Sequence, residues 1–200
     1  MIRTAAVHDD NPEVHEAHRR GIPVFERTQA WGALMRGYPN ALCISGTHGK
    51  TTTTSMCTHI MMAAEKDPTV MIGGTLPLLH ACHRVGKGST IIMESCEYYN
   101  SFLSLNPTIA VILNIEADHL DFFKDIEDIK HSFRQFAERV PAETGTVIAN
   151  CDDANTMDAL SGLKRSTVTF GLDEGDVHAA NLTWHGGFAD FDAIVNGQPY

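Results

Sequence analysis

The sequence predicts an α/β protein with a mostly parallel sheet, and three observations support this. Short apolar strands alternate with helical patterns along almost the whole chain. The segment 108–114 is rich in β-branched residues and apolar through its middle, as expected of a strand covered on both faces. Residues 41–45 form an apolar run that leads into a glycine-bracketed turn and then a helical segment. Such alternation favours parallel strands with helices packed on both faces of the sheet.

Composition narrows the class of protein. The chain has 200 residues, of which 43% are hydrophobic and 20% charged, as in ordinary globular proteins. The net charge of −10 argues against nucleic acid as a partner, because binding to a phosphate backbone needs a basic face. No apolar run reaches the length of a membrane span or of a signal-peptide core, so we expect no membrane association.

Five scattered cysteines without a C-x-x-C pair predict reduced thiols and a cytoplasmic location. A zinc site that includes Cys82 and His83 is an alternative, but the cysteine and histidine spacing matches no common zinc motif.

The first 38 residues predict two strand–helix units. The strands are expected at 4–7 and 22–25. The first helix should begin at Asp10-Asn11-Pro12-Glu13, which supplies a capping side chain and an early proline, and it should end at Gly21. The second helix is expected at 28–35.

The remainder predicts a longer strand–helix alternation that ends in a hairpin. Asp125 should cap the clearest helix, whose apolar residues recur at helical spacing. Asn196-Gly197 predicts a final tight turn with no return strand, which together with the abrupt start leads us to expect a fragment. The expected strands are 41–45, 69–72 (ending at Gly73-Gly74), 90–94, 108–114, 146–150, 167–170, 181–184 and 188–194, and the expected helices are 50–64, 125–140 and 153–160.

The turn after residues 41–45 has the layout of a phosphate-binding loop. It reads Gly46-Thr47-His48-Gly49-Lys50-Thr51-Thr52, in which glycines let backbone N–H groups face phosphate oxygens at a helix N-terminus. A lysine at this place reaches the terminal phosphates, and the following hydroxyl can ligate Mg²⁺. Ile44 stands where the longer form of the motif has glycine. The alternative, a glycine turn before a Thr-rich helix, leaves four consecutive poor helix formers unexplained.

Two further loops should lie at the same edge of the sheet. Glu94 ends the strand 90–94, and ligands in open parallel sheets bind beyond the carboxyl ends of strands. A carboxylate there suits Mg²⁺, although it could be an ordinary solvated acid. The segment 114–121, Asn-Ile-Glu-Ala-Asp-His-Leu-Asp, follows the next strand. His119 could contact a metal or phosphate, or else be a polar loop residue while Asp118 and Asp121 cap the following helix.

These motifs together resemble the Mur ligase family of peptidoglycan synthesis. The loop 46–56 is similar to the family's ATP loop, 114–121 to its second signature, and 94–103 to its E-A-D/C-E-x-x-x-S-F-L segment. The resemblance covers nearly the whole chain. It implies that residues 1–38 are the end of a Rossmann-like UDP-binding domain and that 41–200 are most of a central P-loop ATPase domain, with the C-terminal ligase domain absent.

The resemblance also implies the roles of residues. Lys50 would hold the β- and γ-phosphates, and Thr51, Glu94 and His119 would ligate Mg²⁺, so that Lys50, Glu94 and His119 form the catalytic set. His48 and Asn114 would contact the substrate. The nucleotide-binding residues would be Gly46, Thr47, His48, Gly49, Lys50, Thr51 and Thr52.

The implied activity is amide formation driven by ATP in the bacterial cytoplasm. The spelling of the motifs, with histidine in the middle of the loop, points to the family member that joins L-alanine to the lactyl carboxylate of UDP-N-acetylmuramate through an acyl phosphate. We expect the fragment alone to be inactive. The alternatives are another amide ligase of this type, such as a murein peptide ligase or a folylpolyglutamate synthase-like enzyme, and a non-catalytic P-loop module that binds nucleotide.

Overall fold

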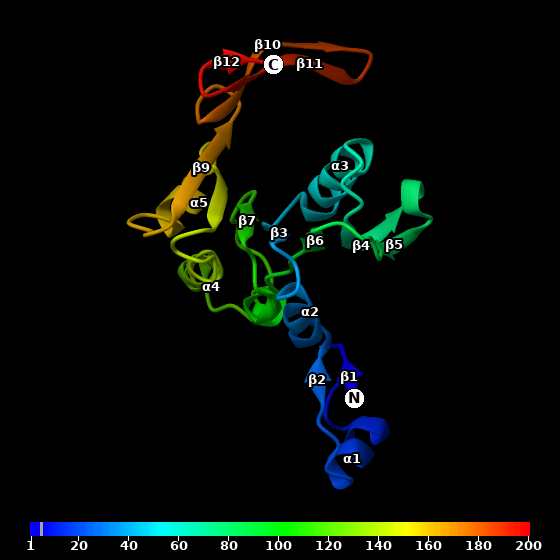
Figure 1. Cartoon of the computed structure of the whole chain (residues 1–200). Coiled ribbons are helices and arrows are strands. Elements are labelled where there is room, and N and C mark those ends of the chain that lie inside the picture. The colour runs from blue at the N-terminus through cyan, green and yellow to red at the C-terminus, as the bar shows by residue number, and fades with distance from the viewer. Residues whose placement is uncertain (5) are drawn as a thin grey trace.

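A computed structural model describes residues 1–4 and 6–200 and contains one large mixed sheet with helices on both faces (Figure 1). The predicted α/β class with a mostly parallel sheet is confirmed. The strand order in the sheet is β12-β11-β10-β9-β8-β7-β3-β6-β4-β5. The strands from β10 to β4 in this order pair in parallel, whereas β5, β11 and β12 pair antiparallel. Their bounds are β3 Asn40–Ser45, β4 Thr69–Leu76, β5 Ala81–Arg84, β6 Thr90–Glu94, β7 Ile109–Ile112, β8 Thr146–Asn150, β9 Ser166–Gly171, β10 Val177–His185, β11 Phe188–Val195 and β12 Gln198–Pro199.

The N-terminal residues form a small separate unit. Strands β1 (Ile2–Arg3) and β2 (Phe25–Glu26) pair in parallel, with α1 (Pro12–Arg19) between them in the chain. The predicted cap of α1 is confirmed, because the Asn11 side chain accepts a hydrogen bond from the Glu13 amide. Figure 1 shows α1 and the β1–β2 pair extending away from the large sheet, with α2 (Arg27–Met35) between the two parts.

The predicted N-terminal strands were misplaced. The strand expected at 22–25 begins only at Phe25. The strand expected at 4–7 includes residue 5, which lies outside the described residues, and the described strand is Ile2–Arg3 instead. Both strands are only two residues long. The β-propensity of the surrounding residues therefore says little about which residues of the two strands pair.

The central strands are buried on both faces, which explains why they are continuously apolar. Alternate residues of a strand point to opposite faces. On β3, Ala41 and Cys43 belong to the core on one face, while Leu42 and Ile44 belong to the core on the other. Burial raises the pKa of the Cys43 thiol to about 12, and all five cysteines are free, as predicted.

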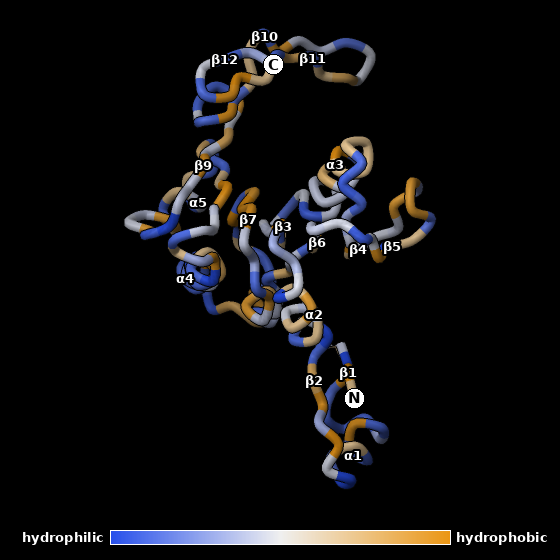
Figure 2. The backbone as a smooth tube through the Cα atoms, viewed as in Figure 1, coloured by the Kyte–Doolittle hydropathy of each residue, from blue (hydrophilic) through white to orange (hydrophobic). Residues whose placement is uncertain are grey.

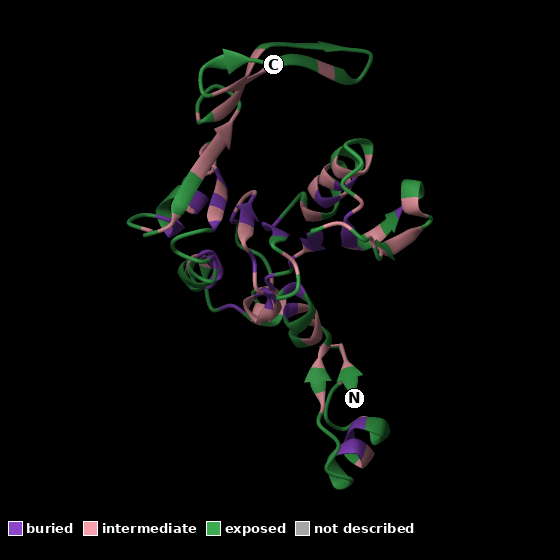
Figure 3. Ribbon diagram, in the orientation of Figure 1, coloured by how far each residue is buried: buried purple, intermediate pink, exposed green. Residues whose placement is uncertain are grey.

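Different helices cover the two faces of the sheet. Helix α3 (Lys50–Ala63) packs against β3, β4 and β6, whereas α4 (Ile126–Glu138) and α5 (Ala154–Ala159) lie over β7 and β8 on the other side. Asp125 caps α4 as predicted, by accepting from the Asp128 amide. Figure 3 shows the buried residues concentrated in the central strands and in the facing sides of the helices, and Figure 2 colours much of the α4 tube as hydrophilic.

Three strand predictions need correction. Strand β4 does not end at Gly73-Gly74 but continues through them to Leu76, where it can pair with β5. Strand β5 was not predicted. The Asn196-Gly197 turn does have a return strand, β12, which pairs with the end of β11.

The longest described helix, α3, has 14 residues, and no described helix has the length and apolar character needed to cross a bilayer.

The buried core beneath α4 lets us predict how one substitution changes the stability of the fold. Phe136 is fully buried and stacks on Phe102 at a ring-centroid distance of 4.6 Å. Phe136→Ala should lower the free energy of unfolding by about 3–5 kcal/mol, because the change leaves a cavity. Phe188→Ala is the control, since Phe188 is 72% exposed on β11, and its effect should stay within about 0.5 kcal/mol. Urea denaturation measures the free energy of unfolding of both variants. Equal losses of this free energy in the two variants would contradict the described core.

Candidate functional site

The site is built where three strands of the sheet end together. Strand β3 lies between β6 and β7, and all three are parallel. The register places Ile44 beside Glu94 and Ser45 beside Ile112. The loops that follow these strands therefore open at one edge, as the sequence predicted.

The glycines of the first loop have conformations that side chains disfavour. Gly46 has a φ of +142°, and a Cβ there would lie 2.9 Å from the Leu113 Cβ atom. Gly49 has a φ of +83° and caps α3 without a side chain. The N-terminus of α3 therefore faces the loop with its backbone N–H groups and partial positive charge, which is the arrangement that binds phosphate.

The threonine hydroxyls at the start of α3 and one turn further along differ in what they contact. Thr51 is exposed and its hydroxyl donates to Glu94 Oε1 at 2.9 Å. Thr54 and Thr58 are fully buried and donate to the carbonyls four residues earlier, so their role is to satisfy the helix interior. Thr52 is exposed in the first turn of α3. Metal binding therefore does not account for the whole run.

Glu94 is held in place by two other elements. Besides the Thr51 contact, its Oε2 accepts from the Gly73 amide of β4 at 2.6 Å. A Cβ on residue 73 would overlap with the Glu94 carboxylate. Glu94 is therefore not an ordinary solvated acid. Its oxygens and the Thr51 hydroxyl are hard donors beside a phosphate loop, and this donor set fits Mg²⁺, which takes its remaining ligands from phosphate and water.

Lys50 is anchored by the loop and by a carboxylate that the sequence did not assign. Its Nζ atom donates to the carbonyls of Gly46 and Thr47 and lies 2.9 Å from Glu97 Oε2. The Glu97 side chain is only 3% exposed. The sequence did place Glu97 within the 94–103 motif, three residues after Glu94. Nothing in that motif, however, indicates that the Glu97 side chain is buried.

His119 lies at the same edge, against the loop that follows β6. Its ring stacks on Tyr98 at 4.3 Å, and its Nε2 atom is 3.8 Å from Glu97 Oε1. Tyr98 donates its hydroxyl hydrogen bond to Asp121, and this carboxylate raises the pKa of the Tyr98 phenol. Asp121 does not cap the following helix, and neither does Asp118, whose carboxylate accepts from the His119 amide. The expected capping of the helix by Asp118 and Asp121 is therefore wrong, since Asp125 caps it.

Asn114 and His48 join the first and third loops. The Asn114 side chain accepts from the His48 amide at 2.8 Å and donates to the His48 carbonyl at 3.1 Å. Thr47 adds a second link, since its hydroxyl accepts from the Glu116 amide at 2.9 Å. The amide of Asn114 thus orders the loop, and its role in substrate binding stays a prediction. The His48 ring is exposed, 3.6 Å from the Glu116 carboxylate.

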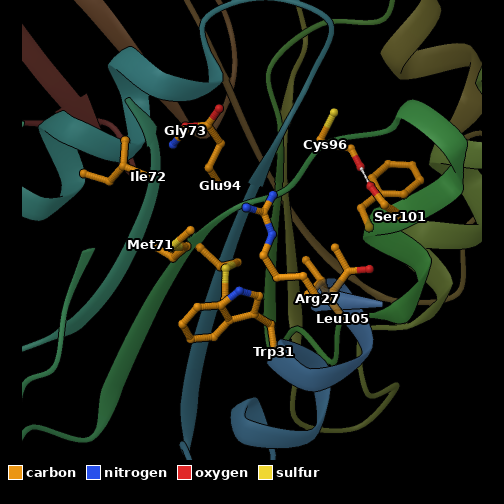
Figure 4. A pocket seen from close by; sticks show the side chains of 12 residues that line it. Arg27, Trp31, Met71, Ile72, Gly73, Glu94, Cys96, Ser101 and Leu105 are labelled. Atoms are coloured by element: carbon orange, nitrogen blue, oxygen red, sulfur yellow. Dashed lines mark hydrogen bonds between the residues drawn. The ribbon is translucent and has the colours of Figure 1, made fainter. Parts of the chain in front are cut away.

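A cavity of about 130 Å³ lies between α2, the middle of β4 and the end of β6 (Figure 4). Glu94 and Gly73 line it from the sheet, and Arg27 and Trp31 line it from α2. Figure 4 shows the Arg27 side chain extending into this space toward the strand that carries Glu94. The Thr28 hydroxyl on the same helix is buried without a hydrogen-bond partner among the described residues. The Arg27 guanidinium and the Glu94 carboxylate thus line the same cavity.

The described residues contain no group of three or more His, Cys, Asp or Glu side chains placed to hold a metal ion, and this includes the surroundings of Cys82 and His83.

Comparison with known proteins gives a consistent family. The Mur ligase middle domain matches residues 44–199, and the domain described as the Mur ligase family, catalytic domain, matches residues 2–39. A UDP-N-acetylmuramate–L-alanine ligase of Caldanaerobacter subterraneus subsp. tengcongensis is 45% identical over 200 residues, which are 99% of this chain and 43% of that protein. The chain thus spans less than half the length of this curated relative.

Solved structures agree on the fold. The UDP-N-acetylmuramate–alanine ligase of Thermotoga maritima has a TM-score of 0.82 at 27% identity, covering all of this chain and 44% of its own. The UDP-N-acetylmuramate:L-alanyl-γ-D-glutamyl-meso-diaminopimelate ligase of Neisseria meningitides has a TM-score of 0.83 at 25% identity, covering 96% of this chain and 64% of its own.

Neighbouring glycines on β4 allow a paired test of the Glu94 position. Gly73→Ala should displace the Glu94 carboxylate and weaken Mg²⁺-dependent nucleotide binding by about tenfold or more. Gly74→Ala is the matched control, because its Cβ would meet only the Thr51 methyl group at an ordinary 3.5 Å. Titration with a fluorescent ADP analogue, with and without Mg²⁺, measures the effect. Equal behaviour of the two variants would show that the Gly73–Glu94 contact does not matter.

Proposed function

Because this chain belongs to the Mur ligase family, we propose that it forms the phosphate-binding part of an ATP-dependent ligase that joins L-alanine to UDP-N-acetylmuramate. The observation that carries the proposal is the convergence of Lys50, Thr51, Glu94 and His119 at one sheet edge. The curated relative with 45% identity bears the name of this activity. The proposed location is the bacterial cytoplasm, where such precursors are made.

The domain assignment is also proposed. Residues 1–38 form the end of the UDP-binding domain, and residues 41–200 form most of the central ATPase domain. The two family matches, 2–39 and 44–199, support this division. So does the separation in Figure 1 between the β1–β2 unit and the large sheet.

Each site residue receives a role consistent with its contacts. The N-terminus of α3 and the Gly46–Gly49 turn bind the phosphates of ATP, and Lys50 neutralises charge on the β- and γ-phosphates. Thr51, Glu94 and His119 would hold Mg²⁺, which supplies charge stabilisation on the transferred phosphoryl group. His48, whose ring is exposed beside the loop, faces the substrate.

The proposed reaction has two steps. The lactyl carboxylate of UDP-N-acetylmuramate attacks the γ-phosphorus, the bond to the ADP oxygen breaks, and an acyl phosphate forms. The free amine of L-alanine then attacks the acyl carbon, phosphate leaves, and the new amide loses a proton. Arg27, in the cavity beside Glu94, is placed to attract the carboxylate before the first step. The site contributes mainly positioning and charge stabilisation.

A sister amide ligase is the main alternative. The fold does not discriminate, because the TM-scores of 0.82 and 0.83 belong to ligases of different substrates. A simple nucleotide-binding module is less well supported, since it does not require Glu94 and His119 beside the loop. Comparison of L-alanine with the murein tripeptide as the substrate for ADP formation decides between the two ligases.

Lys50→Ala should abolish turnover, because it removes the cation from the terminal phosphates. We expect at least a hundredfold loss of L-alanine-dependent phosphate release by the complete protein that contains this segment. Lys124→Ala is the control, since the Lys124 side chain is 86% exposed, and it should retain wild-type activity. Normal phosphate release by the Lys50 variant would exclude the assignment.

His119→Ala should raise the Mg²⁺ concentration needed for half-maximal activity by about tenfold or more. His185→Ala is the control, because this histidine lies at the exposed hairpin end of β10, away from the site. A Mg²⁺ titration of phosphate release measures both variants. An unchanged titration for the His119 variant would remove His119 from the metal site.

A further inference from the structure

Glu97 is a deeply buried carboxylate at the proposed site, and neither the motifs nor the proposed reaction gives it a role. It follows β6 and lies three residues after Glu94. The whole residue is 2% exposed. A buried carboxylate is costly unless it is paired and hydrogen-bonded, so its partners indicate why it is present.

The first partner is the lysine of the phosphate loop. Lys50 Nζ lies 2.9 Å and 3.1 Å from the two carboxylate oxygens of Glu97. The same nitrogen donates to the Gly46 and Thr47 carbonyls. An ammonium group has three protons, and four acceptor atoms, the two carbonyl oxygens and both Glu97 oxygens, lie within 3.1 Å of this nitrogen. Glu97 therefore helps to fix where the Lys50 charge lies above the loop.

The second partner is His119. Its Nε2 atom is 3.8 Å from Glu97 Oε1, which is too long for a hydrogen bond but close enough for charge attraction. The next residue, Tyr98, stacks on the same imidazole at 4.3 Å. Residues 97 and 98 thus hold the lysine and the histidine of the proposed site from one short segment.

We propose that Glu97 is a positioning residue, which holds Lys50 and His119 in the arrangement needed for phosphoryl transfer. This inference rests on the proposed function. Glu97 acts through these two side chains, and it need not touch the reacting atoms. Such supporting contacts matter because displacement of a catalytic group by about 1 Å can cost a hundredfold in rate.

The Glu97→Gln variant separates positioning from binding. It keeps the size of the side chain and one carbonyl oxygen but removes the charge. Loss of a negative charge beside Lys50 does not weaken the attraction of this lysine for phosphates. The variant should therefore bind metal-free ADP at least as tightly as wild type, while kcat falls about 10–100-fold, the usual cost of removing a supporting partner.

Two further variants control the experiment. Glu97→Asp keeps the charge but shortens the side chain by one methylene group. Its kcat should fall between those of the Gln variant and wild type. Glu127→Gln removes another carboxylate that pairs with a lysine, Lys130, but this one is 71% exposed on α4 and should have no effect. Binding of a fluorescent ADP analogue, kcat for phosphate release and the melting temperature are measured for the complete protein.

The outcomes are distinct. A purely structural role would lower the melting temperature and ADP binding together with kcat, and this result would overturn the proposal, as would an unchanged kcat in Glu97→Gln. If that variant does not fold, Glu97→Asp decides, since reduced kcat with retained ADP binding supports positioning and wild-type kcat refutes it. Failure of the proposed function is recognised separately, because the wild-type protein would then release no phosphate in response to L-alanine.

Discussion

The pairing of β3 with β6 on one side and β7 on the other is the constraint on which the site depends. All three strands are parallel, and both of their faces are covered. A one-residue slip would turn every apolar side chain of β3 to the wrong core, so the register is strongly fixed. Fixing the register also fixes the positions at which the three following loops begin. The same burial that stabilises the sheet therefore positions the polar residues beyond it.

The three loops are also joined to one another by polar contacts. Thr51 bonds to Glu94, Lys50 to Glu97, and Asn114 to the backbone of His48. Each link connects residues more than forty positions apart in the sequence. Because the backbone conformation and the partners are set before a ligand arrives, little ordering has to accompany phosphate binding. This is the preorganisation that electrostatic catalysis requires.

Much of this arrangement could be predicted, because it depends on local patterns. The strands at 90–94 and 146–150 have the predicted bounds. The caps at Asn11 and Asp125 could be predicted because Asn and Asp side chains accept hydrogen bonds from the first amides of a helix. Strand β5 was missed because Ala-Cys-His-Arg has no alternating pattern and forms only by pairing with β4. Edge pairing of this kind depends on a distant partner, not on the propensity of the segment.

The candidate site likewise contains residues that could be predicted from local patterns and residues that could not. Its phosphate loop, Glu94 and His119 follow from motif and strand order, since parallel strands open at a common edge. Glu97 could not be identified in this way, because whether an acid is solvated or buried depends on the side chains around it. The Asn114 amide was interpreted as a substrate contact, yet its two bonds to His48 appear only when two loops meet. Residues that support other residues are thus the ones that sequence patterns leave undetermined.

Glu94 connects the two halves of the proposed chemistry. One carboxylate oxygen accepts from Thr51, at the start of α3, and the other from Gly73, which lines the cavity beside α2. The phosphates of ATP would lie on the first side, and the acid substrate would enter from the second, past Arg27. Glu94 would help to hold Mg²⁺ at this place, and the cation would reduce the repulsion between the phosphates and the carboxylate that opposes the first step. Because the Glu94 carboxylate is fixed from two directions, its charge stays at one place in the proposed site.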